Sequence, residues 1–404
     1  MKNPYLTSVG GPDQKDTHYF SGTGSKWDDQ PLCDNEIEPY LRLTAAARRR
    51  RNSTNLQVGD FSPTHFHCLC CAASLRMANP SMKVVVLLRD PVARALSKFL
   101  ELKQQRHLSS FYMDALEIYS YTFVSYVEAE LAVMRRCSDT ARRFRSSASP
   151  RSRLLAAAGR RPRGAAMPRG WGAGWDMGQW MEAQCYARSS ILGWSMYDVF
   201  LENYAAQFGW RQMKVVYTHD LLTAPNDTLH AVEDFLGAPR ARLHPNDKLD
   251  DLVNTRDCYS EACSRKRRQL RPYTEALGAR AGGATALGDN ALVDDLWDPA
   301  AAVAAGGAAT ASAAAASTGS SSSGASGGAA GTSPFGQAVA ALRQLYAPHM
   351  QQLFTWADQG VIPQPPQAWR AAYADIGGSS TNGNGPGRRL QEGGGGGSSS
   401  KLRG

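Results

Sequence analysis

The clearest indication of the fold is the segment Lys83-Val-Val-Val-Leu-Leu-Arg-Asp-Pro-Val-Ala-Arg-Ala-Leu-Ser97. Its continuous run of β-branched and aliphatic residues is typical of a buried strand in a parallel sheet. Pro91 suits the first turn of a helix, and the apolar residues that follow it recur at helical spacing. We therefore predict a strand over 83–88 that leads through a short loop into a helix.

A second unit of the same kind lies further along the chain. Met213 to Tyr217 reads as a strand, followed by a helix over about 227–236 that stops at Gly237. Helical spacing also marks 196–208 and 335–356. Two units in which a buried strand precedes a helix predict an α/β fold, with a parallel sheet flanked by helices.

Three stretches hold too few large apolar side chains to offset the entropy of ordering. We expect disorder in an Arg/Ala/Gly-rich insert over about 140–175, an Ala/Ser/Gly-rich insert over 299–333 and a Gly/Ser-rich tail over 376–404. What remains is the length of one domain. It spans 1–298 and is completed by a C-terminal helix within 334–375.

The chain of 404 residues carries a formal charge of +9. A basic chain can attract nucleic acid, anionic lipid or a polyanionic substrate. Runs such as Arg48 to Arg51 lack interleaved aromatic residues, which argues against a nucleic-acid partner. No apolar run reaches membrane-spanning length, and no signal peptide precedes Lys2. Either the protein is cytosolic, or its targeting segment lies outside this chain.

Eight cysteines and two glycosylation sequons bear on the compartment. No Cys-x-x-Cys pairs with a second one, and Cys68-Leu-Cys-Cys71 lacks a matching His/Cys set, so we predict no metal site. The sequons begin at Asn52 and Asn226. Together with an even cysteine count, they favour a glycoprotein of the secretory lumen that contains disulfide bonds.

Arg89 and Ser97 are the first candidates for ligand binding. Ligands of α/β sheets bind at the carboxyl ends of the strands, where Arg89 lies, and Ser97 follows two helical turns later. A guanidinium and a hydroxyl placed in this way can hold a phosphate through charge-assisted hydrogen bonds. The alternative is an Arg–Asp surface pair and a serine that faces solvent.

The segment from Lys83 to Lys98 resembles the phosphate-binding strand, loop and helix of the Golgi carbohydrate sulfotransferases. In that family, the Arg and Ser of Arg-(Asp/Asn)-Pro-Val-x-Arg-(Ala)-x-Ser bind the 3′-phosphate of 3′-phosphoadenylyl sulfate (PAPS). The resemblance implies these roles for Arg89 and Ser97. It also implies a P-loop NTPase-like sulfotransferase fold and sulfonate transfer from PAPS to a carbohydrate hydroxyl, without a metal.

Other blocks resemble the family in the same order along the chain. Lys15-Asp-Thr-His-Tyr-Phe20 is similar to its Lys-Glu-x-His-Phe-Phe segment, and Gly59-Asp-Phe-Ser-Pro63 to its Glu-x-(Ser/Thr)-Pro segment. The resemblance implies that Lys15 and Asp16 belong to the catalytic site. Asp16 stands where the family has its catalytic base, with His18 as the alternative base. Residues 196–237 and 342–353 match later blocks. The sequence of these blocks is most similar to the chondroitin/dermatan and heparan sulfate branches of the family. This similarity implies a glycosaminoglycan-like acceptor and a Golgi location.

A late segment resembles the family's loop that closes over the nucleotide. Cys258 and Cys263 precede Ser264-Arg-Lys-Arg-Arg268, and the resemblance implies that Arg265, Lys266 and Arg267 bind the cofactor. The alternative is a basic surface loop with two free thiols. For the disulfides we expect Cys258–Cys263 and Cys137–Cys185.

The family's 5′-phosphosulfate loop would precede Asn3, and no similar loop occurs in this sequence. We therefore expect a longer form that contains this loop and an N-terminal membrane anchor. A degenerate relative that binds a nucleotide or a sulfated glycan without catalysis is the competing interpretation. A phosphotransferase of the P-loop kinase type is disfavoured because the chain lacks a Walker lysine.

Overall fold

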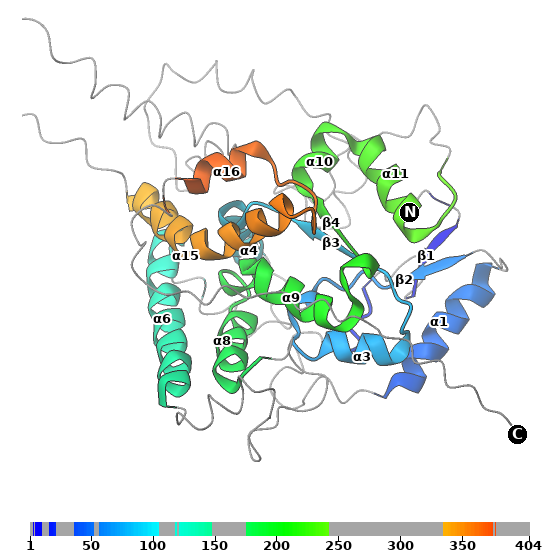
Figure 1. The fold of residues 1–404 in the computed structure, drawn as a ribbon, viewed down its shortest axis with the longest axis horizontal. Coiled ribbons are helices and arrows are strands. Elements are labelled where there is room, and N and C mark those ends of the chain that lie inside the picture. Colours follow the sequence, from blue (N-terminus) through cyan, green and yellow to red (C-terminus); the bar gives the residue numbers. More distant parts are fainter. Residues whose placement is uncertain are drawn as a thin grey trace, which may run out of the picture.

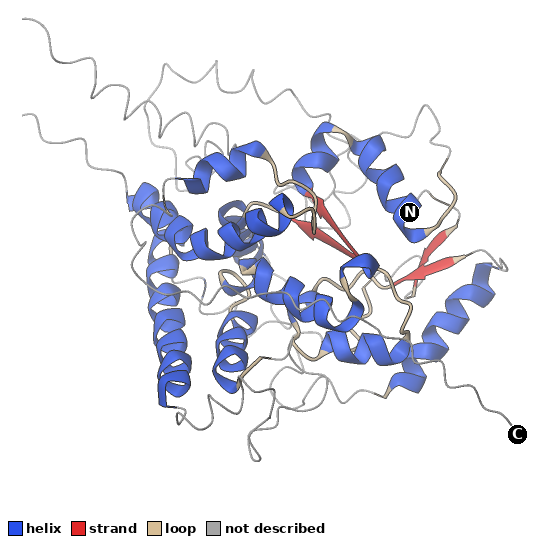
Figure 2. Cartoon of the chain, in the orientation of Figure 1, coloured by secondary structure: helices blue, strands red, loops and turns tan. Residues whose placement is uncertain are grey.

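The computed structural model describes residues 3, 5–9, 16–21, 36–51, 56–104, 118, 121–147, 175–241, 334–374 and 376. These residues form a mixed α/β structure that is mostly helical (Figure 1). Its strands pair as two small parallel sheets, one near the middle of the molecule and one toward the right of the view, with helices around them (Figure 2).

The strand predicted over 83–88 and the helix predicted to follow it are confirmed. Strand β3 spans Val84–Leu88, and helix α4 spans Pro91–Gln104. β3 pairs in parallel with β4 (Met213–Tyr217), with Val84 opposite Met213. Because the two strands run in the same direction, Arg89 emerges at the end of the pair where ligands of α/β sheets bind.

The strands do not form the single sheet that the sequence predicts. β1 (Leu6–Ser8) and β2 (Gln57–Gly59) pair in parallel with each other, apart from β3 and β4. Each is only three residues long, so it carries too few side chains to give a periodic signal in the sequence. Among the described residues, no strand joins the β1–β2 sheet to the β3–β4 sheet.

β3 is also less buried than its composition predicts. Val86 and Leu88 are buried on one face, whereas Val85 and Leu87 on the other face are 39% and 52% exposed. Alternate residues of a strand point to opposite faces. The described part of the chain therefore covers only one face of β3.

Three predicted helices lie where the sequence placed them, to within a few residues: α9 (Tyr197–Phe208), α11 (Pro225–Leu236) and α15 (Pro334–Asp358). Gly237 ends α11 in the left-handed conformation, with φ 73°, which glycine adopts without strain. Lys83 reinforces this helix end by donating from Nζ to the Phe235 carbonyl at 2.6 Å. Two shorter helices, α10 (Thr218–Thr223) and α16 (Gln367–Ala374), have no counterpart in the sequence prediction.

Other helices have no counterpart in the sequence prediction. α6 continues to Ser147, inside the stretch for which we expected disorder, because Ala141 and the apolar residues before it form a buried stripe. These helices are α1 (Ile37–Arg51), α2 (Thr64–His67), α3 (Cys71–Ala78), α6 (Phe123–Ser147) and α8 (Met177–Arg188).

Two disulfides link described residues. Cys137 and Cys185 join α6 to α8, which lie side by side in Figure 1, with their Cα atoms 5.9 Å apart. This pair confirms the prediction. Cys68 and Cys71 form a second disulfide at the start of α3, which the sequence did not predict. The predicted pair Cys258–Cys263 lies outside the described residues.

A buried carboxylate ties the start of the chain to α11. Glu233 is fully buried, and its Oε1 accepts a hydrogen bond from Asn3 Nδ2 at 2.6 Å and from the Ala241 N–H at 3.2 Å. Asn3 also donates to the Pro239 carbonyl at 2.9 Å. These bonds hold the segment before β1 beside α11. In the part of the chain that the structure describes, no helix has the length and apolar character to cross a membrane.

Candidate functional site

The turn between β3 and α4 is fixed by its own backbone. Asp90 caps α4, with its Oδ1 accepting the Ala93 N–H at 2.9 Å and its carbonyl accepting the Arg94 N–H at 2.8 Å. The Arg89 carbonyl accepts the Tyr197 hydroxyl at 2.8 Å. The backbone of Arg89, directly after β3, is therefore held in place, and its side chain is half-buried.

Positive charge gathers at this turn. Burial raises the pKa of Asp90, and the Ala93 N–H and the charges of Arg343 and Arg89 act against that rise. Arg343 comes from α15, so two guanidinium groups from distant parts of the chain lie near the same turn. Ser97 lies two turns into α4 and is half-buried. This arrangement suits a doubly charged oxyanion such as a phosphate monoester.

The second arginine of the motif has a structural role. Arg94 donates to the Ile191 carbonyl and to Ser195 Oγ, both at 3.2 Å, and to the Ser190 carbonyl at 3.1 Å. Its guanidinium also lies 5.6 Å from the Trp194 ring centroid. Arg94 therefore attaches α4 to the segment before α9 and has few donors left for a ligand.

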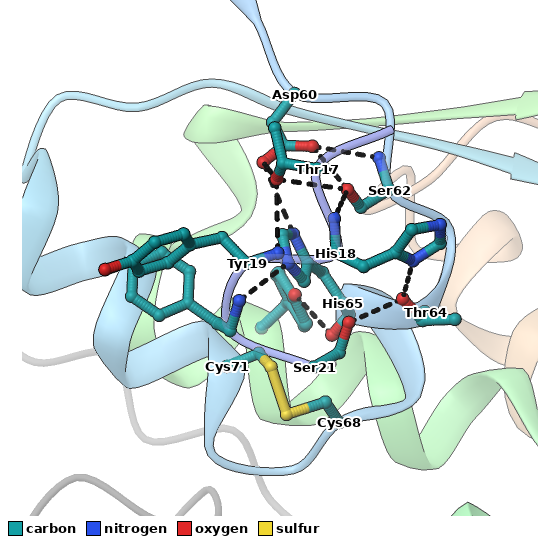
Figure 3. Close-up of polar contacts among 12 residues, drawn as sticks. Thr17, His18, Tyr19, Ser21, Asp60, Ser62, Thr64, His65, Cys68 and Cys71 are labelled. Atoms are coloured by element: carbon teal, nitrogen blue, oxygen red, sulfur yellow. Dashed lines mark hydrogen bonds and ion pairs between the residues drawn. A yellow bond between two sulfur atoms is a disulfide. The ribbon is translucent and has the colours of Figure 1, made fainter. Parts of the chain in front are cut away.

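A second polar cluster joins 16–21 to 60–65 (Figure 3). Asp60 lies at its centre: one carboxylate oxygen accepts Thr17 Oγ1 at 2.6 Å, and the other accepts Ser62 Oγ at 2.6 Å and the Ser62 N–H at 3.1 Å. His65 Nδ1 lies 3.9 Å from the Asp60 carboxylate. A carboxylate with this many donors holds both segments in one geometry.

His18 is the strained residue of this cluster. Its φ of 49° lies in the left-handed region, which residues other than glycine rarely adopt. Its N–H donates to Ser62 Oγ at 2.7 Å, and its Nδ1 lies 2.7 Å from Thr64 Oγ1. Thr64 Oγ1 in turn lies 2.5 Å from Ser21 Oγ. Because Thr64 holds Nδ1, the ring orientation is fixed and Nε2 is left as the other nitrogen able to exchange a proton.

His65 supports this segment as a neutral ring. Burial is the main cause that lowers its pKa to about 4, against the charge of Asp60. Its Nε2 accepts the Phe20 N–H at 3.3 Å. A neutral imidazole that accepts at Nε2 carries its proton on Nδ1, which faces Asp60. His65 therefore orders the backbone after His18.

Helix α9 connects the two clusters. Tyr197 donates to the Arg89 carbonyl, and Tyr204 donates to the His65 carbonyl at 2.7 Å. These tyrosines are seven residues apart on one helix face, a rise of about 10 Å. Asn203 adds a bond from Nδ2 to the Leu69 carbonyl at 2.8 Å. The turn after β3 and the segment after β2 are therefore held at a fixed spacing.

The predicted site residues are distributed as follows. Arg89 lies at the turn after β3 and Ser97 two turns into α4, whereas Asp16 and His18 belong to the segment that Asp60 organises. Lys15, Arg265, Lys266 and Arg267 lie outside the described residues. Sequence reasoning missed Asp60, Thr64, His65 and Arg343 as members of these clusters. For Asp60 a local signal existed, because Asp-x-Ser favours the turn in which Ser62 N–H bonds Asp60.

Comparisons with known proteins find similarity among solved structures. No protein-family model matches the chain, and no curated protein matches it. Among solved structures, it is similar to the crystal structure of a sulfotransferase from Alicyclobacillus acidocaldarius, with a TM-score of 0.34 and 19% sequence identity. That similarity covers 61% of this chain and 78% of the bacterial one.

Proposed function

We propose that this chain is a sulfotransferase that moves the sulfonate group of PAPS to a hydroxyl of a carbohydrate acceptor of the glycosaminoglycan type. The observation that carries the proposal is the position of Arg89. It follows a parallel strand directly, on a backbone fixed by Tyr197 and Asp90, with Ser97 on the helix that begins there. The resemblance of this segment to carbohydrate sulfotransferases supplies the identity of the ligand.

The donor fits the groups around the turn. A 3′-phosphate carries about two negative charges, and Arg89 and Arg343 both act on the Asp90 turn as cations. Ser97 adds a hydroxyl that can donate to a phosphate oxygen. We assign Arg89 and Ser97 to the 3′-phosphate of PAPS, and Arg265, Lys266 and Arg267 to closure over the nucleotide.

The transfer needs a base for the acceptor hydroxyl. That oxygen attacks the sulfur of PAPS, the bond from sulfur to the 5′-phosphate oxygen breaks, and 3′-phosphoadenosine 5′-phosphate leaves. The base takes the hydroxyl proton. Asp16 is our first candidate, because it occupies the position of the family's catalytic carboxylate, beside Lys15. His18 is the second, because Thr64 fixes its Nδ1 and leaves Nε2 for the proton.

Transfer of labelled sulfonate from PAPS to desulfated chondroitin or heparan chains tests the proposal. Once a 5′-phosphosulfate loop is joined ahead of Asn3, we expect transfer by the chain and a loss of about tenfold or more in Arg89→Ala, since a charge-assisted hydrogen bond contributes about 1.5–3 kcal/mol. Asp16→Asn and His18→Gln separate the two bases, because the variant that lacks the base loses transfer but retains nucleotide binding.

Arg42→Ala, which removes an exposed cation paired with Glu38, is the matched control. Nucleotide binding without transfer in the chain that carries the added 5′-phosphosulfate loop would contradict an enzyme and would support the non-catalytic relative.

We further propose that the protein acts in the Golgi lumen, without a nucleic-acid partner. The disulfides Cys68–Cys71 and Cys137–Cys185 suit an oxidising compartment. The sequon at Asn226 lies at the start of α11, with an exposed asparagine side chain. Both features agree with a glycoprotein of the secretory pathway.

A further inference from the structure

A pocket of about 230 Å³ lies beside β4, away from the candidate donor site. It includes Met213, Lys214 and Val215, the first three residues of β4, whereas Arg89 follows the last residue of the paired strand β3. Strands rise about 3.3 Å per residue, so the pocket and the Arg89 turn are separated along most of the length of the sheet. No residue assigned above to the donor or the base lines this pocket.

The inner surface of the pocket is apolar and fixed. Met213, Val215 and Ile362 are buried residues of its lining. Trp210 packs edge-on against Trp356, with ring centroids 5.0 Å apart. These contacts exist without a ligand, so binding a ring here would cost little side-chain ordering.

A second aromatic wall is held by a lysine. Phe235 lies at the end of α11, and Lys83 Nζ bonds its carbonyl and lies 5.6 Å from its ring centroid. The ring therefore has a cation near it and a backbone fixed by the helix end. Aromatic walls such as Phe235 and Trp210 favour a flat ring as the ligand.

Two cations line the same pocket without acidic partners among the described residues. Arg211 is exposed, Lys214 is half-buried, and neither forms an ion pair. The charge of Lys214 acts on Asp234, but the pKa of Asp234 is lowered mainly by the hydrogen bond from Arg240 and least by Lys214. Arg240 binds Asp234 through two nitrogens, at 3.0 and 2.6 Å. Lys214 and Arg211 therefore remain available to an anion.

We propose that this pocket binds a small aromatic anion: one ring that carries a sulfate or carboxylate group. The ring lies against Met213, Val215 and Ile362. Lys214 leaves the opposite face of β4, so the acidic group lies at the edge of β4 that pairs with no described strand, where Arg211 and the long side chain of Lys214 both reach it. The volume is below the roughly 300–1,000 Å³ of pockets that hold drug-sized ligands, so it suits one ring better than a nucleotide. This site is additional to the proposed donor site and does not depend on it.

Calorimetric titration with 4-nitrophenyl sulfate tests the proposal. We expect saturable binding to the wild-type chain and binding at least fivefold weaker in Arg211→Met/Lys214→Met, the effect of about 1 kcal/mol for a lost charge interaction. Arg42→Met/Arg188→Met changes the net charge equally at exposed positions outside the pocket, and it should bind as the wild type does. The neutral ring 4-nitroanisole should bind both double variants equally.

Two further measurements separate this site from the donor site. An excess of 3′-phosphoadenosine 5′-phosphate should not displace 4-nitrophenyl sulfate, and Arg89→Ala should bind it normally. Val361→Trp, which fills the pocket from a half-buried position, should abolish binding while circular dichroism shows a folded chain. Absence of saturable binding, equal weakening in both double variants, or displacement by the nucleotide would each overturn the proposal.

Discussion

Tyr197 and Tyr204, seven residues apart on α9, donate their hydroxyls to carbonyls in two different halves of the candidate site. Tyr197 binds Arg89 at 2.8 Å, and Tyr204 binds His65 at 2.7 Å. A single helix therefore sets the distance between the proposed phosphate-binding turn and the segment that contains the proposed bases. That distance must be right for in-line transfer between a bound donor and an activated hydroxyl.

Phenylalanine substitutions at these tyrosines make a matched pair. Each removes a hydroxyl that donates a hydrogen bond to a backbone carbonyl, and we expect each to lower the free energy of unfolding by about 1–3 kcal/mol. Only Tyr197→Phe should also weaken binding of 3′-phosphoadenosine 5′-phosphate, because only Tyr197 contacts the Arg89 backbone. Urea unfolding and calorimetry measure the two effects. Equal nucleotide affinities in both variants would contradict a positioning role for Tyr197.

Acid should destabilise the fold through His65. The pKa of His65 is lowered to about 4 in the folded chain, mainly by burial, from an ordinary value of 6.5. The unfolded state therefore takes up a proton first as the pH falls. The contribution of neutral His65 is complete above pH 6.5 and is lost as the pH falls toward 4, up to about 3 kcal/mol. Burial lowers the pKa of His67 in the same direction.

Urea unfolding between pH 7.5 and 4.5 measures this loss, and His65→Asn should reduce the slope of the free energy of unfolding against pH.

The effect of His349 on the pH dependence of stability has the opposite sign. Burial alone would lower its pKa, but the charge of Asp198 and a bond of 2.8 Å raise it above its ordinary value. That contribution is present below pH 6.5 and is lost at higher pH.

For His65, an equal loss of stability on acidification in His65→Asn and in the wild type would show that the assignment of a neutral, buried ring is wrong.

The disulfide between α6 and α8 should contribute strongly to stability. Cys137 and Cys185 are separated by 48 positions, and the loop-closure entropy for that length is about 4 kcal/mol. We expect Cys137→Ser/Cys185→Ser to lower the free energy of unfolding by about this amount. Reducing agent should then shift the urea midpoint less in the variant than in the wild type. Identical midpoints for the oxidised wild type and the variant would contradict a stabilising bond.

Secretion should place a glycan on Asn226. The side chain is exposed at the start of α11, and Thr228 completes the sequon. Expression behind a secretory leader in animal cells, followed by glycosidase treatment and mass spectrometry, should show one glycan lost in Asn226→Gln. The sequon at Asn52 lies outside the described residues. An unmodified Asn226 in the secreted protein would count against a luminal location.

The sequence predicts those parts of the fold whose signals are local. β3 and α4 combine a β-branched run with a proline in the first turn, and α11 ends at a glycine, so periodicity and helix-end residues locate them. β1 and β2 are too short for periodicity to register. α6 was missed because its second half is rich in arginine, although Ala141 within it is buried.

The residues of the candidate site also divide into those that a local sequence signal locates and those that only the packing brings together. Arg89 and Ser97 belong to one local motif, so one stretch of sequence suggests both. The partners of Asp60 and His18 come from segments more than forty residues apart, such as Thr17 and Thr64. Arg343 approaches Asp90 from the C-terminal helix. Long-range contacts of this kind depend on the packing of α9 and α15, which no local pattern specifies.

Calorimetric titration of 3′-phosphoadenosine 5′-phosphate into the wild-type chain, Arg89→Ala and Ser97→Ala tests the central claim most directly. We predict saturable binding to the wild type, a loss of about tenfold or more in Arg89→Ala and a smaller loss in Ser97→Ala. Arg42→Ala should bind as the wild type does, because its side chain pairs with Glu38 on the surface of α1. Equal affinity in the wild type and Arg89→Ala, or no binding by a folded wild-type chain, would contradict the assignment of a donor site at this turn.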